Sequence, residues 1–420
     1  MLHVCQVYAT NEYTIPAPIS EMAMAVVPQV SVRPPRQRMR ISLSDQKFLG
    51  LLWQVLVVGA VAGLVLWLWA NALHNLNVRR IATGFGFLSR EAGMPITDTW
   101  IAYNPKDTYL RALAAGVANT LRVALVGIVL ATVLGTLIGI GRLSKNWLIA
   151  KLSAVYVEVL RDLPLLLQLL FWYVLLQGLP PARLAWQPIE GIYLSNRGLM
   201  LPNLQFSLEH FWVLVAALGG LVATLLIHRH ALARQMADGR PRRTWPYAIV
   251  LIVGMPAIVS SAIGATWVVS RPELRGFNFS GGLALAPEYF ALLTALTTYT
   301  AAFIAEIVRA GILAISKGQW EAGAALGLRR RQVLRKIVMP QALRVIIPPL
   351  TSQYLNLTKN SSLAVAIGYQ DIVSVANTTL NQTGQAIEAI TIIMAVFLTI
   401  SLSISLFMNW YNARIALVER

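Results

Sequence analysis

Several charged and polar side chains stand inside or beside long apolar segments of this sequence, where a binding site or a polar pathway would need them. Glu306 and Arg309 are three residues apart, so they would share one face of a helix and form an ion pair. A charged group at the centre of a membrane span costs about 2.5–3.5 kcal/mol on insertion scales, so charges placed there are candidates for function. The candidate pathway residues are Arg161, Tyr299, Thr300, Glu306, Arg309, Asn360, Ser361 and Ser362. Interfacial snorkelling and ordinary hydrogen bonds between helices are the alternative interpretation.

Residue patterns for catalysis, nucleotide binding and metal binding are missing from the sequence. The phosphate-binding pattern GxxxxGK is absent and the dipeptide Gly-Lys does not occur, so the chain is not expected to hydrolyse ATP by itself. The five histidines lack the spacing of metal ligands, and the single cysteine, Cys5, excludes a disulfide scaffold and a cysteine-based metal site. The sequence therefore predicts no enzyme active site, no metal site and no cofactor bound by this chain.

The composition indicates a polytopic membrane protein built from helices. Of the 420 residues, 56% are hydrophobic and only 13% are charged, and the mean hydropathy is +0.60. A helix needs about 20 mostly apolar residues to cross a bilayer. Eight segments qualify: 48–72, 119–141, about 160–179, 210–228, 246–269, about 288–314, about 341–358 and 388–411. Prolines and polar residues interrupt the seventh segment, so we expect it inside the bundle rather than facing lipid.

Lysine and arginine are unevenly distributed between the loops that join these spans. With eight spans, 24 of the 35 lie on one side and ten on the other. The richer side is expected to be the cytoplasm, which places both termini inside. Arg122, near the outer end of the second span, is expected to be a snorkelling anchor. The net charge of +17 is thus a signal of topology, and nucleic-acid binding is not expected.

The chain divides into segments of different character. Residues 1–45 contain several prolines and no apolar period, so we expect a disordered cytoplasmic N-terminus, with a translation start at Met39 as the alternative. Residues 46–420 are predicted to form the transmembrane domain. Within it we expect core helices at about 119–179 and 288–411, an inserted helix pair at 210–269, and a cytoplasmic loop at 316–340.

The loop 316–340, named the bracket below, has the pattern of two short helices joined at a glycine. Its first part is rich in alanine, Gly327 permits a backbone turn that a side chain resists, and a second helix follows that Pro340 is expected to end. Residues 322–325 form a face of small side chains that another surface can approach closely, and Glu321 lies beside it. A basic amphipathic loop on the membrane surface is the alternative interpretation.

The bracket resembles the EAA loop of ABC-importer membrane subunits. Glu321, Ala322 and Gly323 are followed after three residues by Gly327, and after nine more by the sequence Ile-Val-Met-Pro that ends at Pro340. The family pattern is EAA, three residues, Gly, nine residues and I-x-L-P, so glycine replaces the third-position alanine and methionine replaces the leucine. The resemblance implies a coupling helix docked on a separate ATPase, with Glu321 as the ionic contact and Gly327 at the turn.

Segments outside the bracket narrow this resemblance. Residues 157–173, 300–328 and 339–368 are similar to the polar-amino-acid permease branch. The additional spans and the long outer loops are similar to the larger membrane subunit of general L-amino-acid transporters of Gram-negative bacteria. The resemblance covers nearly everything after residue 40. It implies an all-α polytopic protein of the bacterial inner membrane, with about eight transmembrane helices around a five-helix type I ABC-importer permease core.

The resemblance also implies what such a chain carries and what it works with. The cargo would be polar L-amino acids, and the ATP would be used by a partner subunit. The implied partners are a dimer of ABC ATPase subunits, a second homologous permease subunit in a heterodimer, a periplasmic amino-acid-binding protein and membrane lipid. A self-sufficient secondary transporter is the alternative function, and it would need paired repeats and ion-coupling residues near the midplane. A membrane enzyme or scaffold is a third possibility, for which the sequence shows no catalytic constellation.

Overall fold

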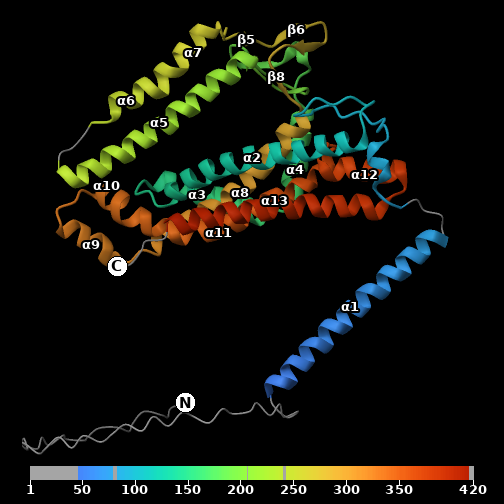
Figure 1. The fold of residues 1–420 in the computed structure, drawn as a ribbon. Helices are drawn as coiled ribbons and strands as arrows, with labels where there is room; N and C mark the ends of the chain where they lie inside the picture. The colour runs from blue at the N-terminus through green and yellow to red at the C-terminus, as the bar shows by residue number, and fades with distance from the viewer. Residues whose placement is uncertain (1–45, 79–82, 206, 240–242, 416–420) are drawn as a thin grey trace, which may run out of the picture. The chain divides into compact units, whose positions relative to one another are not determined.

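The computed structural model of the protein describes residues 46–78, 83–205, 207–239 and 243–415 (Figure 1). The predicted disordered N-terminus, 1–45, lies outside the described residues. The chain divides into two units, 1–75 and 76–420. Helix α1 (Gln46–Val78) begins in the first unit, and its stretch Leu52–Ala72 is long and apolar enough to span a membrane without burying any of its side chains.

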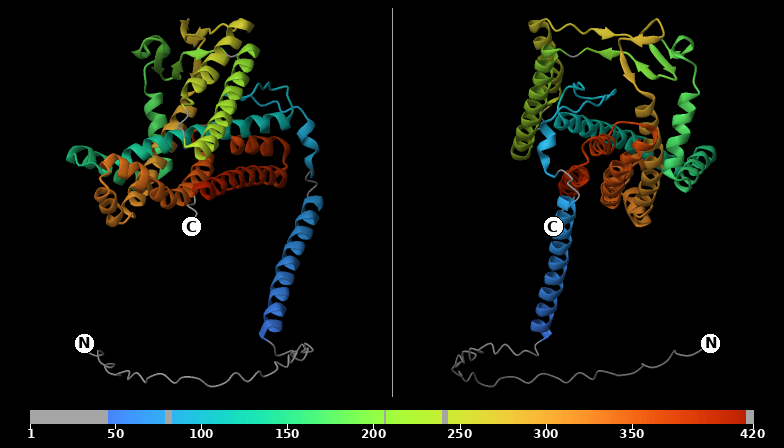
Figure 2. Two further views of the ribbon diagram at one scale, coloured as in Figure 1. Left: turned by 60° about the vertical axis from the view of Figure 1, so that its left-hand side comes forward. Right: turned by 90° about the vertical axis from the view of Figure 1, so that its right-hand side faces the viewer.

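The second unit is built around a bundle of helices (Figures 1 and 2). The bundle consists of α2 (Tyr109–Arg142), α3 (Trp147–Asp162), α4 (Leu165–Gln177), α8 (Pro287–Leu313), α11 (Met339–Asn360), α12 (Ile372–Thr383) and α13 (Ala386–Ile415). Helix α8 packs against α2, α3, α4 and α11. In the most apolar 18-residue stretch of α8, 67% of the residues are buried, whereas in that of α13 only 6% are. Helix α8 is therefore the central span of this bundle. The bundle has a bracket end, where α8 ends and the bracket begins, and a loop end, where α8 begins.

Two glycines allow α2 and α8 to pack closely along their length. A Cβ at Gly135 would lie 2.7 Å from Cβ of Ile304 and 2.8 Å from the carbonyl oxygen of Ala301. A Cβ at Gly139 would lie 2.6 Å from the carbonyl oxygen of Ala305. Since no real side chain fits at these distances, the GxxxG spacing marks the place where the two helices cross.

The predicted number of eight spans is not confirmed. Among the residues that the structure describes, six helices are long and apolar enough to cross a membrane, or seven if the pair α3–α4 counts as one span. The predicted third span, about 160–179, is wrong as a single helix, because α3 and α4 meet at an angle of 105°. Pro164 favours an extended backbone at Leu163, whose φ and ψ are −88° and 132°. Nε2 of Gln168 then donates to the carbonyl oxygens of Leu160 and Leu163, at 2.9 and 3.0 Å.

Helix α11 corresponds to the seventh predicted span and is too polar to be among the six. It holds Pro348 and Pro349 in its interior and packs against α2, α8 and α13. Ile346 and Leu357 are among its buried side chains. The expectation that this segment lies inside the bundle is therefore confirmed.

The segment between α4 and α8 contains a helical hairpin. It is formed by α5 (Leu208–Asp238) packed against α6 (Trp245–Ile249), the π-helical η3 (Val250–Gly254) and α7 (Met255–Ile263). Gly220 permits the crossing, since a Cβ there would lie 2.1 Å from the carbonyl oxygen of Leu251. In the most apolar 18-residue stretch of α5, 22% of the residues are buried, and in that of the segment Trp245–Ile263 none is. Most of the hairpin's apolar surface therefore faces outward.

Three small antiparallel sheets, which the sequence did not predict, flank this hairpin, and two of them pair a strand before it with a strand after it. The largest has the order β1 (Trp186–Ile189), β2 (Ile192–Ser195), β3 (Gly198–Leu201) and β8 (Leu283–Leu285). The two others pair β4 (Asn203–Leu204) with β5 (Val269–Ser270) and β6 (Glu273–Arg275) with β7 (Asn278–Ser280). Strand β8 leads directly into α8, so the largest sheet lies at the loop end. Three short 3₁₀ segments complete the elements outside the bracket: η1 (Phe85–Ser89), η2 (Ala182–Leu184) and η5 (Ser361–Ile367).

Candidate functional site

The bracket joins α8 to α11 and turns at a glycine. It consists of α9 (Lys317–Ala325), α10 (Arg330–Val333) and the π-helical η4 (Leu334–Val338). Gly327 has φ +72°, where an L side chain is strained. Its N–H donates to the carbonyl oxygen of Ala324 at 2.9 Å, and the N–H of Leu328 donates to that of Gly323 at 3.2 Å. These two bonds close the end of α9 around a left-handed glycine, which confirms the predicted turn.

The second helix of the bracket does not end at Pro340, so that prediction is wrong. The chain stays helical from Arg330 through η4 and α11 to Asn360. In η4 the N–H of Met339 reaches back to the carbonyl oxygen of Leu334, which is the wider π spacing. Pro340 then occupies the first turn of α11, where its missing N–H and its ring are tolerated. The bracket is thus continuous with a helix of the bundle, and a displacement of one moves the other.

The predicted face of small residues is divided in two. Gly323 is buried and faces the second helix, since a Cβ there would lie 2.8 Å from Cγ2 of Val333 and 3.1 Å from Cδ1 of Ile337. Its inclusion in an outward face is therefore wrong, and glycine at this position allows the two arms of the bracket to close. Ala322 and Leu326, one helical turn apart, are both exposed, and Leu326 is 77% exposed. These two residues present the outward apolar contact of α9.

Glu321 stands beside that contact with its carboxylate exposed. It has no hydrogen-bond or ion-pair partner in the part of the chain that the structure describes. Its neighbours hold α9 in place: Nε2 of Gln341 donates to Oε1 of Gln319 at 3.2 Å, and Arg330 lies 6.0 Å from the ring of Trp320. A fixed helix therefore presents a free carboxylate and an apolar contact together, which suits binding by another chain.

A cluster of charges lies near the bracket end of the bundle, centred on Glu306. Arg309 donates to both of its carboxylate oxygens, at 2.5 and 3.1 Å, so the predicted pair is confirmed. Arg142, at the end of α2, donates to the same carboxylate, a partner that the sequence did not reveal. Arg161 stays near the cluster, with its guanidinium 5.2 Å from the ring centroid of Phe303. The shared carboxylate joins α2 to α8.

The other candidate pathway residues do not join this cluster. Tyr299 and Thr300 lie near the middle of α8, and Thr300 is buried. The remaining three lie where α11 ends, at the loop end: Asn360, Ser361 and Ser362. The two serine hydroxyls donate to carbonyl oxygens one turn back, at 2.7 and 2.8 Å. The structure thus does not gather the candidates into one site, and their role in a substrate pathway stays a prediction.

A buried polar network at the loop end was missed by the sequence analysis. Nη1 of Arg122 donates to Oδ1 of Asp98 at 2.8 Å, and the guanidinium lies 4.0 Å from the ring centroid of Tyr289. Asn119, with no exposed surface, donates to the carbonyl oxygens of Asp98 and Gln370 at 2.7 and 3.0 Å. The predicted snorkelling role of Arg122 is therefore wrong, because its side chain is only 11% exposed. The available signal was an Asn and an Arg three residues apart within an apolar span.

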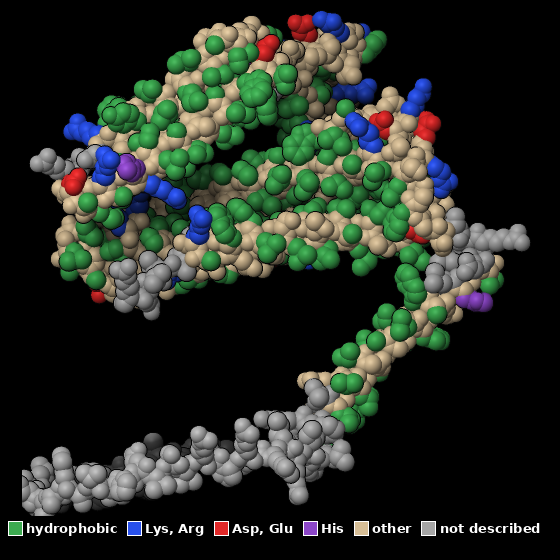
Figure 3. All heavy atoms as spheres, in the orientation of Figure 1, with side chains coloured by type: hydrophobic (Ala, Val, Ile, Leu, Met, Phe, Trp, Pro, Cys, Tyr) green, Lys and Arg blue, Asp and Glu red, His purple; other side chains and the backbone are tan. Residues whose placement is uncertain are grey.

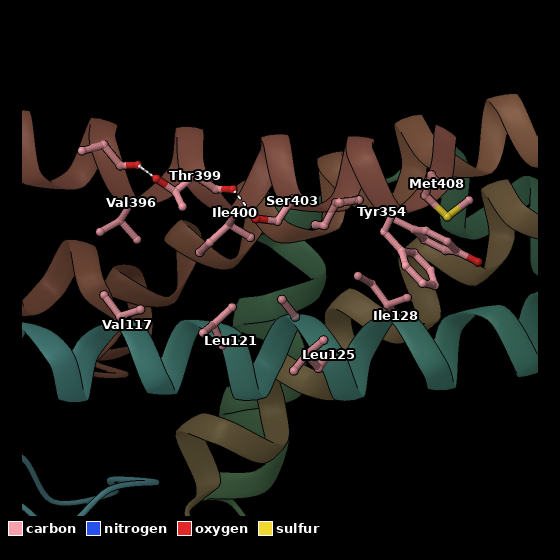
Figure 4. A pocket seen from close by; sticks show the side chains of 14 residues that line it. Val117, Leu121, Leu125, Ile128, Tyr354, Val396, Thr399, Ile400, Ser403 and Met408 are labelled. Carbon is pink, nitrogen blue, oxygen red and sulfur yellow. Dashed lines mark hydrogen bonds between the residues drawn. The ribbon is translucent and has the colours of Figure 1, made fainter. Parts of the chain in front are cut away.

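Two cavities in the second unit differ in chemistry. One, of about 760 Å³, lies between α2, Tyr354 of α11 and α13, and no charged side chain is among its lining residues (Figure 4). Its hydroxyls at Thr399 and Ser403 are occupied, since they donate to carbonyl oxygens within α13 at 2.7 and 2.8 Å. The other, of about 640 Å³, lies at the loop end and has both Glu288 and Arg197 in its wall. Of the two, the second has the groups that a polar ligand needs.

Comparison with known proteins places this architecture among transport proteins. The family described as "Binding-protein-dependent transport system inner membrane component" matches residues 131–417. A protein of Rhizobium johnstonii named general L-amino acid transport system permease protein is 49% identical over 382 residues, covering 91% of this chain and 96% of that one. One of Rhodobacter capsulatus, named glutamate/glutamine/aspartate/asparagine transport system permease protein, is 40% identical, covering 92% of this chain and 99% of that one.

Proposed function

The chain belongs to the family of binding-protein-dependent transport system inner membrane components, and on that premise we propose that it is a permease subunit of an ATP-driven importer of polar L-amino acids. The resemblance found in the sequence is confirmed at the level of the family. Two relatives named as amino-acid permeases match more than nine tenths of the chain, which supports the class of cargo. The family consists of transport permeases, and the ATP hydrolysis is assigned by this proposal to a separate subunit.

The observation that carries the proposal is the bracket with its unoccupied outward contact. In the proposed complex Glu321, Ala322 and Leu326 dock on the ATPase, while Gly323 and Gly327 maintain the shape of the docked element. Both arms of the bracket lead into central helices, since α9 follows α8 and α10 is continuous with α11. Closure of two ATPases around ATP would therefore tilt α8 and α11 and open the permease alternately to either side.

The remaining partners and the orientation follow from this assignment. The bracket lies on the cytoplasmic side of the inner membrane, as do both termini, which agrees with the distribution of lysine and arginine in the sequence. A second, homologous permease subunit completes the pathway, and a periplasmic amino-acid-binding protein delivers substrate to the loop end. In this arrangement the Glu306 cluster lies on the inner part of the pathway, with Arg161 beside it, and Tyr299 and Thr300 lie further along α8.

A self-sufficient secondary transporter is the competing function, and vesicles that contain the chain alone separate the two. Uptake of amino acids driven by an ion gradient, without an ATPase subunit, would favour the secondary transporter. Under our proposal such vesicles take up nothing above the background of empty vesicles.

The proposed function is tested by assembling the complex and measuring its ATPase activity. The chain is co-purified with its candidate ATPase, partner permease and binding protein, and the complex is placed in nanodiscs. We expect ATP hydrolysis to rise when the binding protein is loaded with one of a panel of L-amino acids. No stimulation by any amino acid, in a complex that assembles completely, would contradict the proposal.

Contact through the bracket is tested separately by cross-linking. Glu321→Cys is made in a Cys5→Ser background and treated with a short bifunctional reagent. We expect a covalent product with the ATPase subunit. Glu273→Cys, on strand β6, is the control and is expected to give none.

A further inference from the structure

One tight turn of the largest sheet lies against the first residues of α8. Gly198, the first residue of β3 and the end of the turn from β2, has φ +100°, and a Cβ there would lie 2.0 Å from the carbonyl oxygen of Leu285. The N–H of Asn196 donates to the carbonyl oxygen of Pro180 at 3.0 Å. The turn is therefore held both to the start of α8 and to the segment that follows α4. Arg197, between these two anchored residues, is placed at the loop end of the bundle.

The cavity of about 640 Å³ beside this turn contains opposite charges that do not neutralise one another. Its polar lining residues are Thr97, Asp98, Gln177, Asn196, Arg197, Asn278 and Glu288. The charge of Asp98 is compensated by Arg122 at 2.8 Å. Among the described residues Arg197 has no partner for its guanidinium, and Glu288 receives one long hydrogen bond, from the hydroxyl of Tyr173 at 3.4 Å. One cation and one anion therefore share the wall of the cavity without pairing.

We propose that this cavity binds α-amino acids as zwitterions at the loop end of the permease. The guanidinium of Arg197 binds the α-carboxylate, and the carboxylate of Glu288 accepts hydrogen bonds from the α-ammonium group. The volume is within the usual range of about 300–1,000 Å³ for small-molecule sites. The amides of Gln177, Asn196 and Asn278 supply donors and acceptors for a polar side chain. A ligand with both charges pairs with both Arg197 and Glu288, whereas a simple anion or cation leaves one of these two side chains unpaired.

This inference rests on the proposed function and adds a binding step to it. All α-amino acids share the ammonium and carboxylate groups, so recognition of these two groups selects the class of substrate. The side chain of the substrate would be recognised by the amide groups of the cavity wall. The permease would then hold substrate by itself, before or without the outer binding protein. A loop of the binding protein is the competing occupant of the same cavity.

The test measures binding to the assembled complex of permease pair and ATPase in nanodiscs, without the binding protein. The probe is radiolabelled L-glutamine, and the competitors are N-acetyl-L-glutamine, which lacks the ammonium group, and L-glutamine amide, which lacks the carboxylate. We expect only unmodified L-glutamine to compete strongly. Arg197→Gln and Glu288→Gln should each weaken binding at least tenfold, and Arg197→Lys should recover part of the loss. Each variant should also lose the preference for the group that its side chain recognises.

Controls and transport assays separate the possible failures. Arg271→Gln and Glu273→Gln, exposed charges outside the cavity lining, should bind L-glutamine as the wild type does. Transport with binding protein present is measured on the same preparations. Wild-type transport without any binding in the absence of binding protein would overturn this inference and leave the proposed function standing. Absence of wild-type transport for every amino acid would overturn the function. Loss of binding-protein affinity in Arg197→Gln, without amino-acid binding in the wild type, would make the cavity a protein docking site and refute the inference.

Discussion

The bracket and the buried network at the loop end differ in whether their polar side chains are exposed and unpaired or buried and hydrogen-bonded. Lys and Arg side chains gather around the end of α5 and around the bracket, whereas acidic and basic side chains are mixed at the loop end (Figure 3). Glu321 at the bracket end has no partner in the described part of the chain, and Leu326 is 77% exposed. At the loop end Asn119 and Asp371 have no exposed surface and both are hydrogen-bonded. The buried network at the loop end is thus bonded within the chain, whereas the bracket has an outward contact that no described residue covers.

This contrast predicts where a substitution harms transport and where it harms folding. At the bracket end, changes should weaken coupling while the isolated permease stays as stable as before. At the loop end, changes in the buried network should lower stability, because a polar group that is buried without its partner costs free energy.

The largest effect is expected from Gly327→Val. The φ of +72° at this turn strains any L residue and strains a β-branched one most, so the two arms of the bracket should lose their relative orientation. We expect transport by the assembled complex to fall to background, while the melting temperature of the purified permease is nearly unchanged. Uptake assays and thermal unfolding in detergent measure the two quantities.

Gly327→Asn is the matched control, because asparagine tolerates the left-handed region better than other residues. No atom lies within 4 Å of a Cβ built at this position, so the control tests conformation rather than crowding. Asparagine should retain a substantial part of the transport. Equal loss in both variants would contradict a conformational role and would indicate contact of Gly327 itself with the partner.

The second prediction concerns pH and Asp371, which caps α12 by accepting a hydrogen bond from the N–H of Ser374 at 2.9 Å. Burial raises the pKa of this carboxyl from 3.8 to about 7. Because the native state holds the proton more tightly, its contribution to stability is complete below about pH 4 and is lost as the pH rises towards 7. A pKa difference of about three corresponds to on the order of 4 kcal/mol.

The substitution Asp371→Asn isolates this contribution, since asparagine keeps the helix cap and cannot ionise. We expect the wild type to lose melting temperature between pH 5 and pH 8 by more than the variant does. Parallel pH profiles of the two proteins would show that the carboxyl is not shifted in the folded state.

A somewhat smaller effect is expected from Arg122→Met, which keeps the length of the side chain and removes its charge. Asp98 would remain without its partner, and breaking a buried pair in this way costs about 3 kcal/mol. Arg275→Met is the control, because its ion pair with Glu273 is 76% exposed on the arginine side and should contribute less than about 1 kcal/mol. Thermal unfolding of both variants checks the difference, and the double variant Asp98→Asn with Arg122→Met should recover part of the loss.

The same contrast explains what could be predicted from the sequence. The bracket is one continuous segment of 25 residues, so its glycine turn and its family pattern could be recognised from the local sequence. The network at the loop end joins residues far apart in the sequence. Asn119 donates to the carbonyl oxygen of Gln370, and the N–H of Ile372 donates to the hydroxyl of Thr120. No local pattern reports such pairings, and Arg122 therefore looked like an interfacial anchor.

Other errors have equally specific reasons. Glu306 and Arg309 were paired correctly because they are three residues apart, whereas Arg142, 164 residues away from Glu306, was counted only as a loop charge. The apolar residues around Pro164 are numerous enough for one membrane span, so a single helix was predicted there. A proline at that place, however, favours the bend that separates α3 from α4. The strands are only two to four residues long, which is too short for an alternating pattern to be detected, and two of the pairs, β3 with β8 and β4 with β5, join segments on either side of the inserted hairpin.

The smallest predicted effect concerns how firmly the bracket is fixed to the bundle. Nε2 of Gln341 donates to Oε1 of Gln319 at 3.2 Å, and this exposed bond connects α9 to α11. Gln319→Ala should cost no more than about 1 kcal/mol of stability, because water replaces an exposed partner easily. If the bracket transmits force through its attachment to α11, transport should still fall about two- to threefold. Gln341→Ala also removes a bond from Nε2 to the carbonyl oxygen of Ile337 at 3.0 Å, within the same run of helix. The double variant should be no worse than Gln341→Ala alone, since the bond between the two glutamines is already lost in it. Additive losses in that cycle would show that each glutamine acts separately, through its own contact with the ATPase, and that the bond between them does not fix the bracket.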